Sequence, residues 1–257
     1  MLQYRAAAVA GAGTQFFWGF IRIMILMGFY RSSSAVQPMD LADVITYVWL
    51  GQAFLALLPW IHDRDLEQQI REGGVAYELL RPTDLYAFWY VRTLATRIAS
   101  ASLRCVPILL VAGVALPLLG FPEWRLAPPP STAAFTAFAI SLSAAVILGS
   151  ALMMLVHVSL LWTISGDGVA RLMPSVVMFF SGMVVPLPLF PDWAQPFLSV
   201  MPFRALVDVP FRLYSGDIPA SLAFGPIALA LAWTVALVLL GRRLLARGQR
   251  ALVVQGG

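Results

Sequence analysis

The sequence predicts an all-α integral membrane protein, a single membrane-spanning domain over residues 1–257 with six transmembrane helices. Hydrophobic residues make up 60% of the chain and charged residues only 12%, whereas a soluble domain carries about 25% charged residues. Apolar runs recur along the whole length, and a spanning helix needs about 20 mostly apolar residues. The 17 basic residues flank these runs instead of clustering on a polar module, which is typical of membrane topology.

The apolar runs place the six spans and orient them. We predict spans at residues 12–30, 41–61, 101–120, 132–163, 171–190 and 219–241. An even number of spans puts both termini on one side. The segments on that side carry Arg5, Arg64, Arg71, Arg81, Arg92, Arg97, Arg171, Arg242, Arg243, Arg247 and Arg250, and the opposite side carries Arg31, Arg125, Arg204 and Arg212. Because cytoplasmic loops are enriched in basic residues, we predict that both termini are cytoplasmic.

The first span has an unusual start and an unusual charge. Residues 1–11 are mildly apolar with one charge, so we predict an N-terminal interfacial helix along the membrane surface. A frayed terminus is the alternative. Arg22 lies inside the first apolar run, where an arginine costs about 3 kcal/mol on insertion scales. We therefore expect Arg22 to face protein or a water-filled cavity.

The segment between the second and third spans, residues 62–84, is polar and predicts two short amphipathic helices. Asp63 can cap the first helix and a glycine pair ends it, while Pro82 stops the second. Short helices that protrude from the membrane in this way can transmit the motion of a bound partner to the spans. A solvated loop whose charges only obey topology is the alternative.

The third span belongs to a helical pattern that is too long for one bilayer. Residues 84–119 would form a helix of about 54 Å, against a hydrocarbon core of about 30 Å. We therefore predict that the segment splits into an interfacial piece and a span. Its polar residues recur every four positions, at Arg92, Thr96, Ser100 and Arg104, with Arg97 beside them. Arginines that snorkel to the headgroups explain this stripe, and a stripe facing a polar route is the alternative.

Residues 186–219 hold seven prolines, which forbid one continuous helix between the fifth and sixth spans. Leu198, Phe203 and Phe211 are among several residues there that are too apolar for an aqueous loop. We predict a broken, re-entrant helical pair that dips into the outer leaflet, with an interfacial loop as the alternative. Beyond the last span, four arginines in the tail would contact lipid headgroups.

Catalytic and metal-ligating residue types are scarce. His157 is the only histidine in a predicted span, where a hydrogen bond to a neighbouring helix is the main interpretation and a proton relay the alternative. An intramembrane hydrolase would have only Ser165 and His157 as nucleophile and base, and the lone Cys105 is far from both histidines. Without any lysine, the chain cannot form a Gly-x-x-x-x-Gly-Lys phosphate loop. We predict no catalytic site, metal, cofactor or nucleic-acid partner.

The run Arg-Glu-Gly-Gly-Val-Ala-Tyr-Glu-Leu-Leu-Arg-Pro at residues 71–82 resembles the coupling-helix region of type-2 ABC transporter permeases, in the branch of bacterial two-component exporters. In that family this loop docks onto a separate ATP-binding subunit. The resemblance implies contact with the ATPase by Arg71, Glu72, Tyr77, Glu78, Leu79, Leu80 and Arg81.

The proline-rich segment is also similar to that family, whose permeases carry re-entrant outer helices between spans five and six. The resemblance implies an outer gate that includes Pro191, Trp193, Pro196, Phe197, Pro202 and Phe203. It further implies export by alternating access between two permease chains, identical or homologous, in the bacterial inner membrane. Two copies of the ATPase would bind ATP and Mg²⁺. An ion-gradient-driven secondary transporter is the alternative function.

The translocation route is predicted from residue type. Methionine and aromatic side chains form adaptable surfaces for varied apolar cargo. On this basis the candidate route residues are Phe17, Trp18, Arg22, Met178 and Phe179. Ordinary packing or lipid contact is the alternative for each of them.

Overall fold

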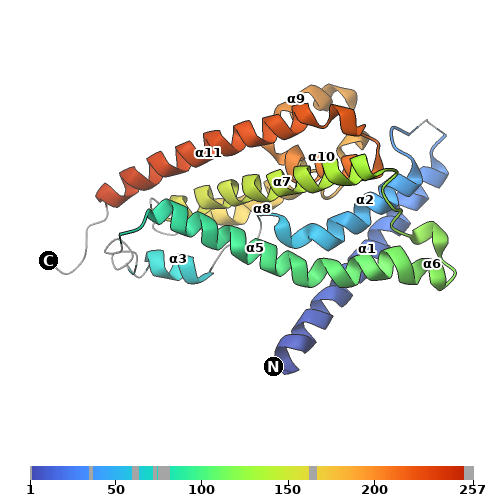
Figure 1. Ribbon diagram of the computed structural model, residues 1–257, viewed down its shortest axis with the longest axis horizontal. Coiled ribbons are helices and arrows are strands. Elements are labelled where there is room, and N and C mark those ends of the chain that lie inside the picture. The colour runs from blue at the N-terminus through green and yellow to red at the C-terminus, as the bar shows by residue number, and fades with distance from the viewer. Residues whose placement is uncertain are drawn as a thin grey trace.

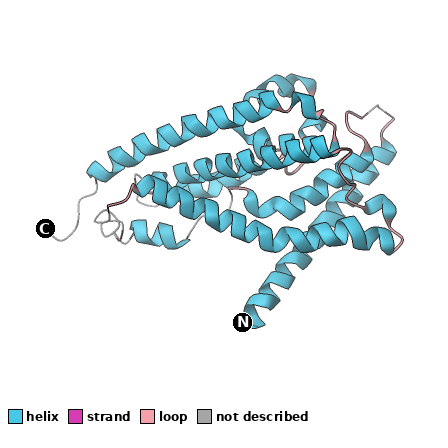
Figure 2. Cartoon of the chain, viewed as in Figure 1, coloured by secondary structure: helices cyan, strands magenta, loops and turns pink. Residues whose placement is uncertain are grey.

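The computed structural model describes residues 2–34, 37–59, 64–71, 74, 82–161 and 167–251, and every regular element in these ranges is a helix (Figures 1 and 2). The main helices are α1 Leu2–Ser32, α2 Leu41–Phe54, α3 Arg64–Arg71, α5 Leu85–Leu110, α6 Leu116–Leu118, α7 Thr132–Ser159, α8 Asp167–Phe180, α9 Gln195–Val200, α10 Asp208–Ser215 and α11 Phe224–Ala251. Short 3₁₀ turns are η1 Leu55–Leu57, η3 Pro122–Trp124, η4 Leu187–Leu189, η5 Asp192–Ala194, η6 Pro202–Leu206 and η7 Ala220–Leu222, and η2 Val111–Ala115 is a π-helical turn.

Three helices of the described chain are long and apolar enough to cross a membrane. They cover Leu85–Leu118, Thr132–Ser159 and Ala220–Gln249, and they overlap the third, fourth and sixth predicted spans. Shorter apolar helices at Leu41–Leu57 and Arg171–Phe180 overlap the second and fifth predicted spans. Helix α1 overlaps the first predicted span. The all-helical membrane fold is confirmed, while the count of six spans and the side of the termini stay predictions.

Two predictions about helix breaks are wrong. Residues 2–11 do not form a separate interfacial helix but continue into α1, because this alanine-rich stretch favours helix. Residues 85–118 do not split either, since no glycine or proline occurs between Leu85 and Pro107. The π-helical turn η2 follows Pro107, and there the Ala112 carbonyl accepts a hydrogen bond from Leu126 N–H at 2.9 Å.

The fifth predicted span, residues 171–190, is about half helical. Helix α8 ends at Phe180, and Gly182 then adopts a left-handed conformation with φ of 86°. Only glycine adopts this conformation without a steric cost. The prolines at 186 and 188 prevent the helix from resuming, so the chain continues through η4, η5 and α9 instead.

Helices α2 and α7 form the centre of the bundle. Every residue of α2 from Val44 to Ala53 is buried, and α7 packs against α5, α10 and α11. Helix α1 docks on α2 at Gly19, where a Cβ atom would lie 2.8 Å from the Trp49 ring. The Trp49 indole N–H donates to the carbonyl of Trp124 at 2.7 Å, which ties the loop after α6 to the core.

The two ends of the bundle differ. One end carries α3, the start of α5 and the C-terminal part of α11, and is called the α3 end (Figure 1). The opposite end carries α6 and the loop after α1, and is called the α6 end. The first half of α1 projects away from the other helices in this view.

Candidate coupling and translocation sites

Helix α3 confirms a short helix after the second predicted span. Arg71 is its last residue, and Glu72, Tyr77, Glu78, Leu79, Leu80 and Arg81 lie outside the described residues. Leu66, within the charged sequence RDLEQQIR, is fully buried. It belongs to a hydrophobic cluster with Trp89 of α5, Val158 of α7 and Leu245 of α11. The sequence prediction did not include Leu66, although an isolated leucine among charges was a visible signal.

A second set of contacts joins the start of α5 to α11 at the α3 end. Asp84 caps α5, since its Oδ1 accepts from Ala87 N–H at 2.8 Å, and its Oδ2 accepts from Arg242 Nη1 at 2.8 Å. The Ala87 N–H and the Arg242 guanidinium lower the pKa of the Asp84 carboxyl. Arg242 also lies over the ring of Tyr86, 5.4 Å from its centroid. Gly241 permits this approach, because a Cβ atom there would lie 2.8 Å from Tyr86.

Arg97 of α5 is buried within the bundle, with 6% of its surface exposed. Its Nη1 donates to the Leu57 carbonyl at 2.7 Å, at the end of η1. A helix end leaves carbonyls without intrahelical partners, so Arg97 caps the broken end of the second span. Gly149 of α7 lies against both groups. Snorkelling therefore does not describe Arg97, whereas Arg92 and Arg104 remain partly exposed.

Arg22 performs a similar task at the end of α8. Its Nη2 donates to the carbonyls of Met183 and Val184, the latter at 2.9 Å. The Tyr47 hydroxyl donates to the Gly182 carbonyl at 3.1 Å, and Asp208 N–H donates to the Ser181 carbonyl at 3.2 Å. The expectation that Arg22 faces protein is thus confirmed, and its partners are backbone carbonyls.

The segment after α8 encloses a buried ionic network. Asp208 is fully buried and lies 3.6 Å from Arg204 Nη2 and 3.4 Å from Arg212 Nη1. Arg212 Nε also bonds Asp217 Oδ2 at 2.5 Å. These ion pairs link η6, α10 and the turn before η7. Sequence reasoning missed this network, although three of its members follow each other at four-residue spacing.

The family model for ABC-2 family transporter proteins matches residues 16–256. This match covers nearly the whole chain. The chain belongs to the ABC-2 transporter family. No curated protein and no solved structure matches the chain. The resemblance to a type-2 ABC permease is confirmed.

The predicted gate residues of this ABC-2 permease differ widely in environment. Pro202 is buried and Phe203 is partly buried, with its ring 6.1 Å from the ring of Phe180. Phe197 also contacts Phe180, at 6.3 Å between ring centroids. Trp193 is 82% exposed, and Pro191 and Pro196 are exposed beside it. Phe180, at the end of α8, therefore contacts two of the predicted gate residues.

The predicted route residues lie on two helices of the permease. Phe17 and Trp18 of α1 are 62% and 55% exposed. Phe179 of α8 is exposed, and Met178 packs partly against the main core. Arg22 of α1 donates to the carbonyls of the turn that follows α8. Their role as route walls stays a prediction.

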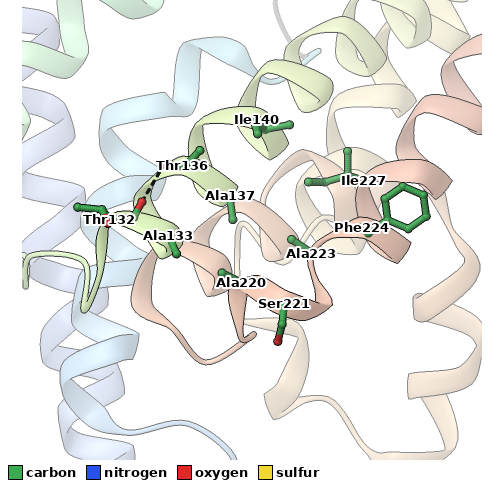
Figure 3. Close-up of a pocket in the computed structure, with 10 residues that line it drawn as sticks. All are labelled: Thr132, Ala133, Thr136, Ala137, Ile140, Ala220, Ser221, Ala223, Phe224 and Ile227. Carbon is green, nitrogen blue, oxygen red and sulfur yellow. Dashed lines mark hydrogen bonds between the residues drawn. The ribbon is translucent and has the colours of Figure 1, made fainter.

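A groove of about 680 Å³ opens between the start of α7 and the η7–α11 junction (Figure 3). Thr132 and Thr136 line one side, and Phe224 and Ile227 line the other. Thr136 Oγ1 donates to the Thr132 carbonyl at 2.9 Å, so this hydroxyl is already satisfied. None of the described residues lining the groove is charged, and none belongs to the predicted sites. The described residues contain no group of three or more histidine, cysteine, aspartate or glutamate side chains placed to hold a metal ion.

Proposed function

We propose that this permease is the membrane-spanning subunit of an ATP-driven exporter in the bacterial inner membrane. It would form a translocation route with a second permease chain, identical or homologous. Two copies of a separate ATPase would bind ATP and Mg²⁺ and drive alternating access. The chain itself would contribute no catalytic group and no cofactor.

The observation that carries this proposal is the anchoring of α3. Helix α3 directly precedes residues 72–81, which resemble the ATPase-contacting segment of type-2 permeases. Leu66 fixes α3 to α5, α7 and α11 at the α3 end. Because packed interiors transmit displacement instead of absorbing it, a push on this segment would move three long helices together.

The exposed charges near the end of α11 are consistent with a cytoplasmic location of the α3 end. Arg243 and Arg247 are exposed near the end of α11, where a cytoplasmic leaflet would supply anionic lipid headgroups. The exposed aromatic side chains of α1, Phe17 and Trp18, are available for contact with a second permease or with cargo.

Purification of the tagged chain, expressed with its native neighbours, tests the assembly. We expect an ATP-binding protein and a permease chain to co-purify, and transport by the reconstituted complex to require ATP. Transport that persists without ATP and follows a proton or sodium gradient would instead establish the secondary transporter.

Substitutions in the predicted ATPase-contacting segment test the coupling. We expect Glu78→Arg, or Leu79→Ser together with Leu80→Ser, to abolish substrate-stimulated ATP hydrolysis while the chain still inserts into the membrane. Leu118→Ser with Leu119→Ser is the matched control, because this leucine pair is exposed at the α6 end. Unchanged coupling in both test variants contradicts the assignment.

A further inference from the structure

Arg22 lies on an exposed apolar face of α1. Trp18, Ile25 and Phe29 share its side of the helix, since residues three and four positions apart are neighbours on a helix surface. These three side chains are all exposed, and Arg22 itself is partly exposed between them. A guanidinium on a face that contacted only lipid tails would be costly. The Arg22 guanidinium reaches the carbonyls after α8 from this face, so a positive charge lies beside exposed apolar side chains.

The hydrogen bonds of Arg22 leave much of its guanidinium available. Nη2 donates to both carbonyls after α8, and an arginine carries five N–H donors. Nε and Nη1 make no hydrogen bond, and no carboxylate pairs with the guanidinium, within the described part of the chain. Backbone carbonyls are dipoles and do not neutralise a full charge. The site thus presents a positive charge with three free donors.

Capping of α8 does not by itself require an arginine at this position. Two neighbouring carbonyls, those of Ser181 and Gly182, are satisfied by a backbone N–H and by the Tyr47 hydroxyl. Neutral groups therefore suffice for the same task a few residues away. The charge of Arg22 adds something that a neutral cap would not, namely attraction for an anion.

We propose that Arg22 binds the anionic group of an amphipathic cargo, while Trp18 and Phe29, the exposed aromatic residues on the same side of α1, hold its apolar part. A guanidinium carries a permanent positive charge that attracts a carboxylate or phosphate. Because Nη2 is used for the carbonyls after α8, Arg22 offers an anion this charge and single hydrogen bonds from Nε or Nη1. The proposal rests on the proposed function in one respect, because it takes the exposed face of α1 as a wall of the translocation route.

Binding of two lysophospholipids that differ only in headgroup charge tests this inference. The full complex, in nanodiscs of phosphatidylcholine, is titrated with radiolabelled oleoyl-lysophosphatidic acid, oleoyl-lysophosphatidylcholine or inorganic phosphate. We expect wild-type protein to bind the anionic lipid at least tenfold more tightly than the zwitterionic one, and to bind inorganic phosphate weakly. Equal affinity for the two lipids overturns the proposal, and phosphate binding as tight as that of the anionic lipid overturns the role of the aromatic residues.

Matched variants separate charge recognition from helix capping. Arg22→Met should abolish the tenfold preference, and Arg22→Lys should retain part of it. Arg31→Met removes an exposed arginine from the end of the same helix and should leave the preference intact. Tyr47→Phe removes a neighbouring cap without changing the charge, so it should also retain the preference. Loss of the preference in Tyr47→Phe or Arg31→Met contradicts a specific role for Arg22.

The outcome is distinguishable from that of the proposed function. A complex that contains an ATP-binding subunit but shows no charge preference refutes only the anion site. A preference that depends on Arg22 in a chain that purifies without such a subunit refutes only the ATP-driven mechanism.

Discussion

At the scale of single residues, two arginines, Arg22 and Arg97, lie where other helices end. Arg97 bonds the Leu57 carbonyl, and Arg22 bonds the carbonyls after α8. Within a bilayer an unpaired carbonyl has no water to bond, so it must find a donor in the protein. The strong donors of arginine, brought from another helix, satisfy this need at both broken ends.

Gly182 provides a residue-scale prediction. Its positive φ favours glycine, and the Tyr47 hydroxyl occupies the space that a Cβ atom would need. We expect Gly182→Ala to destabilise the protein by more than about 1–2 kcal/mol, because a left-handed conformation alone costs that much. Thermal unfolding in detergent measures the effect. Gly28→Ala, at a helical site with no atom nearby, is the control and should not destabilise; equal losses in both variants would contradict the argument.

At the scale of elements, α5 connects the separate parts of the α3 end. Its Trp89 shares a hydrophobic cluster with Leu66 of α3, its Arg97 bonds the end of η1, and its cap Asp84 and its Tyr86 contact Arg242 of α11. We therefore expect a displacement of α3 to reach α5 through the Leu66 cluster. We expect α5 to move as one body with these neighbours.

Removal of the α3 anchor tests this connection. Leu66→Ala should cost about 2–5 kcal/mol of local stability, the range measured for buried leucine truncation. Hydrogen exchange of residues 64–71 should become faster, while exchange in α10 should stay unchanged. Leu103→Ala, at an exposed position of α5, is the matched control. Slow exchange in the Leu66 variant would show that α3 is held in another way.

The contact between α5 and α11 predicts a pH dependence. The pKa of Asp84 is lowered in the folded state, so its stabilising effect is present above about pH 4, the usual aspartate range. The effect is lost as the pH falls through the lowered folded pKa.

Asp84→Asn keeps the helix cap but removes the ion pair, which is worth less than about 1 kcal/mol because both side chains are half exposed. We expect the melting temperature of this variant to fall less than that of the wild type between pH 6 and pH 3. Asp192→Asn, at an exposed site, should follow the wild type; a wild-type curve matching that of Asp84→Asn would contradict the prediction.

At the scale of the whole molecule, the two ends of the bundle should face opposite sides of the membrane. Cys105 is the only cysteine, so single-cysteine variants can be built on a Cys105→Ala background. A membrane-impermeant maleimide should label Trp193→Cys in intact cells and Arg247→Cys only in inverted vesicles. Both parent residues are exposed. Labelling of both from the same side would contradict the predicted topology.

Composition and pattern alone determined the class of the protein. A chain with 60% hydrophobic residues and dispersed arginines is suited to lipid, where no water is present to bond backbone N–H and C=O groups. A helix pairs all of these groups within its own segment. The run at residues 71–82 pointed to the permease family that residues 16–256 match. A helix after the second span was also readable, from charge pattern and the glycine pair that follows.

Only the tertiary structure decided how the long apolar runs end and which side chains hold those ends. The halving of the fifth span, the roles of Arg22 and Arg97, and the burial of Leu66 all depend on contacts between segments far apart in sequence. The hydrogen-bond acceptors of Arg22 and Arg97 are backbone carbonyls, which every residue has, so the sequence cannot indicate which carbonyl is used. Residue type therefore predicted that Arg22 needs a partner, and the packing of α1 against the end of α8 decided which partner it has.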